Sequence, residues 1–403
     1  MKKLLVLTTR FPYPVVGGDR LRIYQICKAL SCHYQLTLLS QCETREEEEM
    51  ALPDDGVFSA VERIFMSRWH SWLNCVAALP GSVPLQVAYY QNAKFRERAK
   101  VLMSQHDACL SHLIRAGDTV KDLQGVKFLE MTDAISLNYE RIRKTGHAKN
   151  DWRAHIFSLE SRRLRRYEES VPDFFNHSFL VSEIDRHFLF GEQQERLSRV
   201  SVCSNGVDLE EMPYQFTSDG QDIVFIGNMH SLQNLDAANF MATEVLPLIR
   251  AQCLHSSLRL IGRIHHEDAM RFKKLDGVKV AGEVPDVASA AEGGRVGVCP
   301  LRLGAGVQNK VLEYMALGLP TVSTSLGLEG FNAQDGKELL VADDAQGLAD
   351  AVLNLLNDRV KAKFMAEAAR FYVESTHSWQ AQLAPLLGTI GESLQRTGKS
   401  NVS

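Results

Sequence analysis

A chain of 403 residues is long enough for two domains, each with a hydrophobic core of its own. Its apolar content of 45% and charged content of 23% are ordinary for a globular protein in water, and its formal net charge of −4 argues against general binding of nucleic acid. The eight cysteines are scattered without a CxxC pair, so we expect neither a zinc site nor a disulfide framework, and a reducing, cytoplasmic location. No apolar run approaches the ~18 residues of a membrane span.

In the first half of the chain, apolar runs alternate with helical segments, which is typical of a doubly wound parallel sheet. We expect its strands at 4–9, 35–41, 61–66, 108–113, 126–131, 174–182 and 200–207. The first strand, LLVLTT, follows the N-terminus directly, with no separate signal-peptide pattern before it. The loop RFPYPVVGGD then leads to a helix at 20–30, and its glycines, Gly17 and Gly18, allow a ligand to approach the backbone closely. A simple strand–helix turn is the alternative.

The segment after the third strand carries an apolar and aromatic stripe at helical spacing, made of Trp69, Trp72, Leu73, Val76 and Leu79. Arg63 and Arg68 lie just upstream. An aromatic stripe with basic flanks can lie in a membrane interface. A helix that faces the core is the more common explanation, and the sequence leaves both open.

Two candidate site residues lie at the end of the strand predicted at 108–113. His112 is placed at the carboxyl end of a parallel strand, where open α/β sheets build their sites, and Arg115 follows it. His112 can contact a bound ligand, such as a phosphate, or it can be a buried structural histidine.

Residues 141–166 are locally basic. A basic face on an acidic chain can dock anionic lipid head groups or a polyprenyl diphosphate. A solvated helix with internal ion pairs is the alternative.

After a polar segment at 214–221, which we interpret as the interdomain linker, strands and helices alternate again. We expect a long helix that ends near residue 251, a helix at 378–394, and strands at 222–228, 258–263, 278–284, 296–301, 321–324 and 339–342. Arg263 follows a strand and can face a ligand. Glu329 lies in the loop after the strand at 321–324 and can line the same pocket.

The stretch 296–330 carries most of the interpretable chemistry. A buried strand, the loop Leu303-Gly304-Ala305-Gly306, a helix at 307–317 and a second strand make a crossover unit, so the two strands should be parallel. The helix buries a face made of Val307, Val311, Leu312 and Met315. Gly318 should cap the helix and Pro320 should prevent its continuation.

Lys310 and Glu313 lie three residues apart near the start of that helix. The unpaired N–H groups and the positive dipole end favour an anion there, and Lys310 adds a full charge. Glu313 repels phosphate, but it can accept hydrogen bonds from the two hydroxyls of a ribose that the phosphate carries. A nucleoside diphosphate would fit this unit. The alternative is an i,i+3 ion pair worth a few tenths of a kcal/mol.

The sequence KVLEYMALGLPTVST resembles the donor-site segment of the retaining, nucleotide-sugar-dependent GT-B glycosyltransferases of group 1, or family 4. It is most similar to bacterial surface- and exopolysaccharide transferases with the pattern GxxNKxLExMAxGxPVVxT. The loop with Gly17 and Gly18 and the segment SNGVD at 204–208 also resemble this family. Many relatives have a first glutamate where this chain has Ala305, so the role of that carboxylate is open.

The resemblance implies the GT-B fold, two Rossmann-like doubly wound domains that face a central cleft. We expect an acceptor domain at 1–213, a donor domain at 214–377, and a last helix at 378–403 that crosses back to the first domain. The donor-binding residues would be Gly17, Gly18, Arg263, Gly306, Gln308, Asn309, Lys310, Glu313 and Glu329. Lys310 and His112 would be catalytic, Lys310 by stabilising the leaving nucleoside diphosphate.

The resemblance also implies the reaction, transfer of a hexose from a nucleotide-diphosphate sugar to a hydroxyl of a glycan or a polyprenyl-diphosphate-linked acceptor, with retention. No Asp-x-Asp stands where a divalent metal would be needed, so we expect neither metal nor cofactor. We expect a cytoplasmic protein with peripheral contact to the inner face of the plasma membrane through its first domain. A GT-B sugar-nucleotide epimerase, or a non-catalytic GT-B partner subunit, is the alternative.

Overall fold

The computed structural model describes residues 1–15, 18–144, 152–217, 219–304 and 307–400, and it divides into two compact units. Unit 1 comprises Met1–Ser204 and Leu383–Ser403, and unit 2 comprises Asn205–Gln382. The division falls before the predicted linker because that linker packs on unit 2, where the Gln215 backbone N–H donates to the Leu317 carbonyl at 2.9 Å. The last helix begins in unit 2 and ends in unit 1.

Unit 1 is built on a seven-stranded sheet in the order β3-β2-β1-β4-β5-β6-β7, and every neighbouring pair is parallel. The strands are β1 Lys3–Thr8, β2 Gln35–Cys42, β3 Ala60–Phe65, β4 Ala108–His112, β5 Lys127–Thr132, β6 His177–Leu180 and β7 Val200–Val202. Each predicted strand of the first half is confirmed. The central strands are apolar on both faces because helices cover both, as in other parallel sheets.

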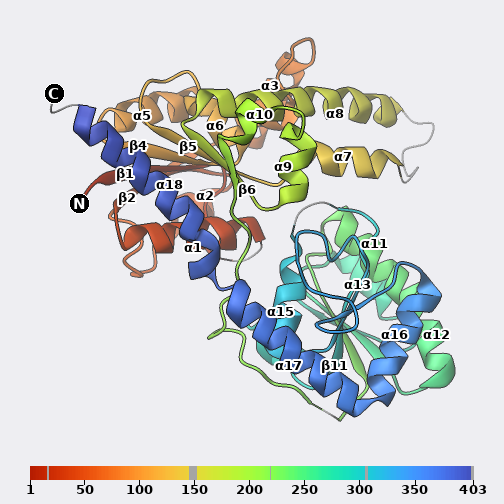
Figure 1. Ribbon diagram of the computed structural model, residues 1–403. Helices are drawn as coiled ribbons and strands as arrows, with labels where there is room; N and C mark the ends of the chain where they lie inside the picture. Colours follow the sequence, from red (N-terminus) through yellow and green to blue (C-terminus); the bar gives the residue numbers. More distant parts are fainter. Residues whose placement is uncertain (16–17, 145–151, 218, 305–306, 401–403) are drawn as a thin grey trace. The chain divides into compact units, whose positions relative to one another are not determined.

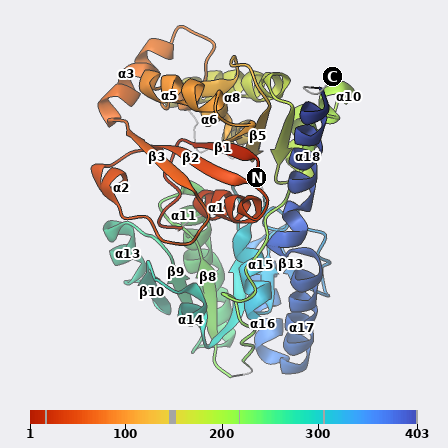
Figure 2. The same ribbon diagram turned by 90° about the vertical axis from the view of Figure 1, so that its left-hand side faces the viewer.

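In two views at right angles, α5, α6 and α8 lie on one side of this sheet and α1 lies on the other (Figure 1, Figure 2). The helices of unit 1 are α1 Gly18–Ser31, α2 Arg45–Glu49, α3 Arg68–Ala78, α4 Leu85–Ala88, α5 Ala93–Met103, α6 Ile114–Val120, α7 Ile135–Lys144, α8 Trp152–Ser170, α9 Glu183–Phe190 and α10 Gln194–Leu197, with a 3-10 turn, η1, at Val171–Phe174.

Unit 2 repeats the plan with a six-stranded parallel sheet in the order β10-β9-β8-β11-β12-β13. Its strands are β8 Asp222–Ile226, β9 Ser257–Ile261, β10 Val278–Gly282, β11 Gly294–Cys299, β12 Thr321–Ser323 and β13 Leu340–Val341. Its helices are α11 Leu232–Phe240, α12 Leu246–Gln252, α13 His266–Phe272, α14 Val287–Ala291, α15 Asn309–Leu317, α16 Ala345–Asn357 and α17 Arg359–Thr376, with α18 at Trp379–Ser400. A π-helical turn, η2 Met241–Val245, joins α11 to α12. Both units are therefore Rossmann-like and doubly wound, as predicted.

The predicted crossover unit is formed by β11, α15 and β12. The two strands are parallel neighbours with Gly297 opposite Thr321, and α15 ends at Gly318, whose φ of 76° is left-handed. A side chain at Gly318 would meet the Tyr214 ring at 2.5 Å, so a glycine is required there for two reasons.

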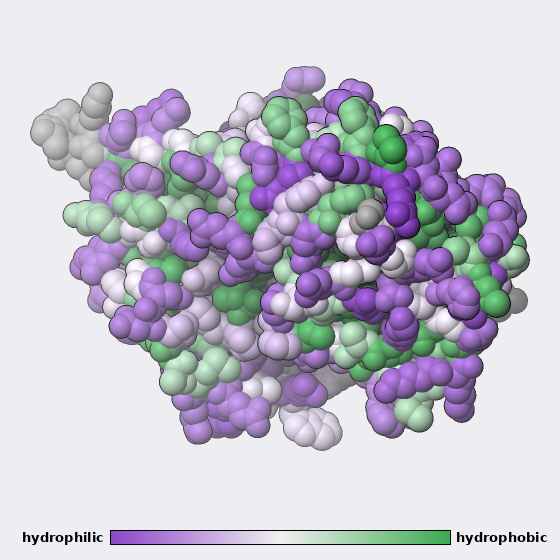
Figure 3. Space-filling view, turned by 90° about the horizontal axis from the view of Figure 1, so that it is seen from below, coloured by the Kyte–Doolittle hydropathy of each residue, from purple (hydrophilic) through white to green (hydrophobic). Residues whose placement is uncertain are grey.

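The apolar stripe of α3 faces solvent, so of the two alternatives that the sequence left open, the core-facing helix is excluded. The exposed fractions are 81% for Trp69, 64% for Trp72, 64% for Leu73 and 62% for Val76, and only Ser71 of the helix is buried. Helical periodicity shows that the residues share a face, but not what covers that face. Elsewhere, on the face drawn in Figure 3, hydrophobic residues lie among hydrophilic ones, as is usual for a surface in water.

None of the helices among the described residues is long and apolar enough to cross a membrane. Part of the predicted basic segment at 141–166 lies outside the described residues, which omit 145–151. In the described part, Arg165 pairs with Glu169 at 2.9 Å, and Arg163 donates to the Leu79 carbonyl at 2.6 Å.

Candidate active site

The strand order of each sheet reverses at one point, between β1 and β4 in unit 1 and between β8 and β11 in unit 2. In open α/β sheets, ligands bind outside the carboxyl ends of the strands at this switch point. The candidate site residues of both units follow these strand ends: His112 ends β4 in unit 1, and α15 follows β11 in unit 2.

In unit 2, glycines bring the ends of β8 and β9 into close contact. The Gly227 N–H donates to the Ile261 carbonyl at 2.9 Å, and Gly262 has a φ of 126°. A Cβ atom at Gly262 would lie only 2.1 Å from the Gly227 carbonyl oxygen, which no side chain tolerates. The backbone itself therefore forms the floor beside the switch point.

Lys310 is fixed at this floor by a neighbour from α11. Its Nζ donates to the Asn234 Oδ1 at 2.5 Å and lies 5.1 Å from the centre of the Phe225 ring, and only 7% of the residue is exposed. Burial lowers the pKa of this ammonium, and the charge of Glu313 opposes the shift. No ion pair joins Lys310 to Glu313 in the described part of the chain, so the i,i+3 alternative does not describe the two residues.

Glu313 is half-buried, and its carboxylate makes no hydrogen bond or ion pair with any residue that the structure describes. Burial raises the pKa of the carboxyl, and the charge of Lys310 opposes that shift. A half-buried carboxylate without a protein donor is costly unless a ligand supplies the hydrogen bonds. The arrangement therefore suits a ligand that carries hydroxyl groups.

Tyr314, which sequence reasoning missed, holds α15 against the sheet. Its hydroxyl accepts from the Ile226 N–H at 2.7 Å and donates to the Val298 carbonyl at 3.1 Å, so one side chain ties the helix to β8 and β11. Gly297 makes room for the ring, since a Cβ there would lie 2.5 Å from it. A tyrosine on the buried face of a helix, opposite a glycine in a strand, was the available signal.

The other predicted donor residues have mixed placements. Asn309 accepts from the Asn205 side chain at 2.7 Å, and Gln308 precedes α15 without a side-chain cap. Arg263 is paired with Glu283 at 2.8 Å, and Glu329 is half-buried in the loop after β12.

Gly18 is the first residue of α1, and Gly17, Ala305 and Gly306 lie outside the described residues.

Two histidines that the sequence reading passed over also lie in this region. His230 follows β8 and His265 follows β9, and their rings stack with centroids 3.9 Å apart and planes 11° apart. Both are exposed. The available signal was a histidine shortly after each of two strands.

In unit 1, His112 is part of a buried charged cluster. Its Nδ1 lies 2.6 Å from the Glu130 Oε2, and the Arg22 Nε donates to the other oxygen of Glu130 at 2.8 Å. Glu130 is buried, yet the charge of Arg22 and the hydrogen bond from His112 lower its pKa to about 2. The carboxylate is therefore ionised, and the His112 Nδ1 carries the proton that it accepts.

Backbone strain marks the same place. Leu113, directly after His112, has a φ of 70°, and Thr132, at the end of β5, has a φ of 64°. Thr132 also donates to Glu130 from its N–H at 3.0 Å and from its hydroxyl at 2.8 Å. Residues other than glycine rarely adopt such φ values, and those that do are concentrated at functional sites.

Sequence reasoning also missed Glu130 and Arg22. The signals were a carboxylate inside an apolar strand and an arginine on the inner face of a helix. Arg22 is 1% exposed and donates at 2.7 Å to the Cys203 carbonyl, which ties α1 to the end of β7.

No group of His, Cys, Asp and Glu residues among those described is arranged to hold a metal ion.

Comparison with known proteins agrees with this geometry. Residues 220–358 match the family described as "Glycosyl transferases group 1". A relative from Klebsiella pneumoniae, an "uncharacterized 44.6 kDa protein in cps region", is 23% identical over 164 residues, which are 39% of this chain and 42% of that protein. The match thus spans less than half the length of this relative.

Three solved structures have the same fold over nearly the whole chain. Sucrose-phosphate synthase from Thermosynechococcus elongatus superposes with a TM-score of 0.71 at 15% identity, over 98% of this chain and 100% of that one. Anabaena HepE in complex with UDP and glucose superposes with a TM-score of 0.66 at 13% identity, over 97% of this chain and 100% of that one. A glycosyltransferase from Rickettsia africae superposes with a TM-score of 0.62 at 13% identity, over 98% of this chain and 99% of that one.

The fold is therefore that of the GT-B glycosyltransferases. Within it, residues 220–358, which contain α15, Lys310 and Glu313, match the group 1 glycosyltransferase family. The fold and the family resemblance that the sequence predicted are confirmed.

Proposed function

We propose that this chain is a hexosyltransferase that moves a hexose from a nucleotide-diphosphate sugar to a hydroxyl of a glycan or of a polyprenyl-diphosphate-linked glycan. The observation that carries the proposal is the separation of Lys310 from Glu313. Asn234 holds the ammonium, and the Glu313 carboxylate has no protein donor among the described residues. The group 1 segment, the relative from a cps region and the HepE complex with UDP and glucose support the substrate class.

The donor would be held by its ribose and its diphosphate. Glu313 accepts hydrogen bonds from the vicinal hydroxyls of the ribose, which a half-buried carboxylate does better than a solvated one. The diphosphate lies at the N-terminus of α15, where the helix dipole favours an anion. Lys310 supplies the charge, and Asn234 keeps the long side chain in one position, so little ordering is required when the donor binds.

The difficult step is the departure of the nucleoside diphosphate. Negative charge grows on the leaving oxygen, and a fixed ammonium nearby stabilises it. The ammonium of the buried Lys310 has little contact with water, and the diphosphate would supply hydrogen-bond acceptors for it. Lys310 therefore acts on the transition state more than on the bound sugar.

In unit 1, His112 would contact the sugar or the acceptor. Glu130 accepts the proton on Nδ1, so the Nε2 of a neutral ring is left as an acceptor for a hydroxyl group. The hydrogen bond with Glu130 fixes the direction of this ring, directly before the strained backbone of Leu113. His112 would then orient the reacting hydroxyl, with Glu130 and Arg22 as positioning residues.

We further propose that the reaction retains the configuration of the anomeric carbon and requires no metal ion and no cofactor. The support is the resemblance to retaining relatives and the positive groups at α15, which take the role that a divalent cation plays elsewhere.

The test is a transfer assay with the full chain, labelled nucleotide sugars and a lipid-linked glycan fraction as acceptor, with and without EDTA. Release of nucleoside diphosphate that needs both donor and acceptor, is unchanged by EDTA and gives a retained anomer by NMR would support the proposal. Isomerised donor without acceptor would indicate an epimerase. Donor binding without any product would indicate a non-catalytic subunit.

A second part of the proposal is a cytoplasmic location with peripheral contact to the membrane through α3. Its exposed Trp69 and Trp72 suit the head-group region of a bilayer, where aromatic residues gather. Cationic side chains lie beside the stripe: Arg68 begins α3, and Arg163 donates to the carbonyl of Leu79 at the helix end. Their charge favours anionic lipids.

This contact is tested by sedimentation with vesicles of neutral lipid and with vesicles that also contain anionic phosphatidylglycerol. The wild type should sediment with the anionic vesicles, and the double variant Trp69→Ala, Trp72→Ala should not. The matched control is Phe364→Ala, Phe371→Ala, which removes two exposed aromatic residues of α17 and should sediment like the wild type. Equal sedimentation of both double variants would contradict a role for α3.

A further inference from the structure

Two arginines meet the same tyrosine at the carboxyl ends of β1 and β4 in unit 1. Arg10 follows β1, and its Nε donates to the Tyr90 hydroxyl at 3.2 Å. Arg115, three residues after His112, lies on the ring of Tyr90, with its guanidinium carbon 4.7 Å from the ring centre. The strand order reverses between β1 and β4, so both arginines lie where ligands of such sheets bind.

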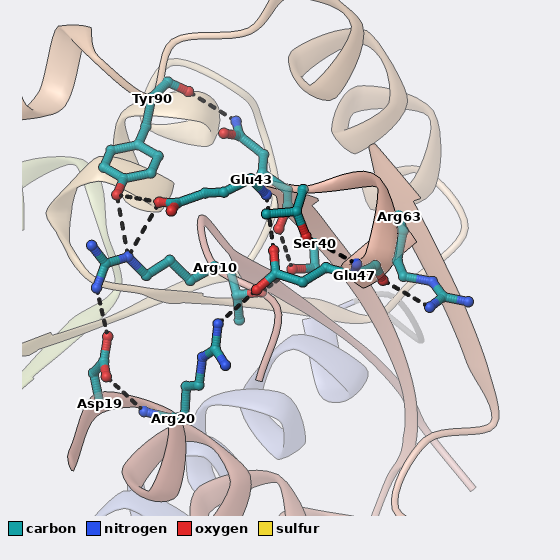
Figure 4. A network of polar contacts seen from close by, with 11 residues as sticks. Arg10, Asp19, Arg20, Ser40, Glu43, Glu47, Arg63 and Tyr90 are labelled. Atoms are coloured by element: carbon teal, nitrogen blue, oxygen red, sulfur yellow. Dashed lines mark hydrogen bonds and ion pairs between the residues drawn. The ribbon is translucent and has the colours of Figure 1, made fainter. Parts of the chain in front are cut away.

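The charge of Arg10 is compensated. It lies 3.4 Å from the carboxylate of Asp19 and 3.4 Å from that of Glu43, and the Tyr90 hydroxyl donates to Glu43 at 3.0 Å. Figure 4 shows the Arg10 guanidinium between Tyr90 and Glu43 on one side and Asp19 on the other. This network needs no further anion.

Arg115 is not compensated in this way. Its buried Nε has no hydrogen-bond partner, and its guanidinium makes no hydrogen bond or ion pair with any residue in the described ranges. The Thr9 hydroxyl is also buried without a partner, and it lines a small pocket together with Tyr90. Unsatisfied buried donors of this kind are rare in folded proteins and are expected to meet a ligand or water.

Arg115 and His112 both lie at the carboxyl end of β4. Burial raises the pKa of the Asp19 carboxyl, but the nearby charges of Arg10 and Arg115 help to hold it below its ordinary value. Because Arg115 lies in α6, directly after the strand that His112 ends, a ligand that reaches His112 would also be within reach of the Arg115 charge.

We propose that Arg115, supported by the ring of Tyr90, binds an anionic group of the acceptor substrate, a phosphate or a carboxylate close to the hydroxyl that is glycosylated. This inference rests on the proposed function, because it assigns the acceptor of that reaction to a chemical class. A planar guanidinium that already stacks on an aromatic ring is ordered before binding, and it can offer two parallel N–H groups to such an anion.

The test is binding of small probes to the full chain: glucose 1-phosphate for a phosphate, glucuronate for a carboxylate, glucose as the neutral control, and UDP for the donor site. Wild-type protein should bind at least one anionic probe at millimolar concentration and more weakly as salt is added. Arg115→Gln should weaken that binding about 10- to 100-fold, the loss expected for a charge-assisted hydrogen bond, and should leave UDP binding unchanged. A preference for glucose 1-phosphate would indicate a phosphorylated acceptor, and a preference for glucuronate an acidic glycan.

Two variants separate the ring from the hydroxyl of Tyr90. Tyr90→Phe removes the contact to Arg10 but keeps the ring under Arg115, so it should bind the anionic probe like the wild type. Tyr90→Ala removes the ring and should behave like Arg115→Gln. Arg98→Gln, which breaks a surface pair with Glu62, is the control for loss of one charge from unit 1.

The inference would be overturned if the wild type bound no anionic probe, or if Arg115→Gln bound the anionic probe as tightly as the wild type does. It would also be overturned if Arg115→Gln lost binding of UDP but kept binding of the anionic probe, because Arg115 would then belong to the donor site. If no nucleoside diphosphate binds the wild type, the proposed function fails, and the anionic probes still report on Arg115 by themselves.

Discussion

Lys310 donates to the Asn234 amide at 2.5 Å and does not pair with Glu313, although the two charged residues lie three apart on one helix. A lysine and a glutamate at this spacing usually form a weak surface pair. Here the ammonium is turned to α11, and the carboxylate keeps its acceptors for a ligand. The separation of the two charges is what makes α15 a candidate donor site.

Lys310→Ala should lower kcat by about 10²- to 10³-fold, because it removes one positive group from the place where charge develops in the transition state. KM for the donor should change less, and steady-state kinetics with the nucleotide sugar measures both. Lys337→Ala is the control, since Lys337 is an exposed lysine of the same unit. A Lys310→Ala enzyme with wild-type turnover would end the catalytic assignment.

Tyr314→Phe should destabilise the protein by about 1–3 kcal/mol, because it leaves the buried N–H of Ile226 without an acceptor. Urea denaturation followed by circular dichroism measures the change. Tyr89→Phe is the matched control, since the Tyr89 hydroxyl makes no hydrogen bond to a described residue and its loss should change stability little. Equal stability of both variants would show that the hydroxyl does not tie α15 to the sheet.

Gly262→Ala should be far more harmful than Gly282→Ala. Both glycines have a positive φ, 126° and 78°, but a Cβ at Gly262 would lie 2.1 Å from a backbone oxygen, whereas nothing lies within 4 Å at Gly282. Backbone strain adds to the steric contact at Gly262, because a φ of 126° lies further from the left-handed region than the 78° of Gly282, so Gly262→Ala should lower the unfolding temperature much more. Similar unfolding temperatures would contradict the close approach of β8 and β9.

Glu130 should make the stability of unit 1 sensitive to acid. Its pKa in the folded protein is about 2, below the ordinary value of 4.5, so its contribution is present above pH 4.5 and is lost as the pH falls toward 2. Glu130→Gln should be less stable than the wild type at pH 7, by roughly 3–5 kcal/mol for a broken buried pair. Denaturation at pH 7, 4 and 3 should show this difference shrinking below pH 4.5, and a constant difference would contradict the ionised state of Glu130.

Asp133 should have the opposite dependence. Burial and the nearby Asp185 raise its pKa to about 8, so the folded protein holds a proton that the unfolded chain releases above pH 3.8. Stability should therefore fall as the pH rises toward 8, at no more than about 1.4 kcal/mol per pH unit. Asp133→Asn should flatten this fall, which thermal unfolding between pH 5 and 8 measures. If the stability of the wild type and of Asp133→Asn fell equally as the pH rises, Asp133 would be excluded as the cause.

The parts of the fold that follow from local pattern were predictable. Buried parallel strands are short apolar runs, and the crossover unit around α15 is delimited by Gly318 and Pro320, so its strands, helix and cap could be read directly. Lys310 and Glu313 could be identified because they lie on one turn of that helix.

The parts that depend on distant partners were not predictable. The ion pair of Arg22 with Glu130 joins α1 to β5 across more than a hundred residues, and Arg263 meets Glu283 only because β9 and β10 are neighbours. The stripe of α3 has the period of a core-facing helix, and no local signal shows that it faces solvent. Such contacts are set by the strand order, which the periodicity of one segment does not contain.

The most direct test of the donor site is the thermal stability of the wild type and of Glu313→Ala with UDP, GDP, ADP and CMP, each with and without EDTA. A ligand at about 100-fold its Kd stabilises a protein by ~2.7 kcal/mol, which is a visible shift. We predict that one nucleoside diphosphate stabilises the wild type, that EDTA does not change the shift, and that Glu313→Ala loses most of it. No shift with any nucleotide, or an equal shift in the variant, would contradict the assignment of α15 as the nucleotide-sugar site.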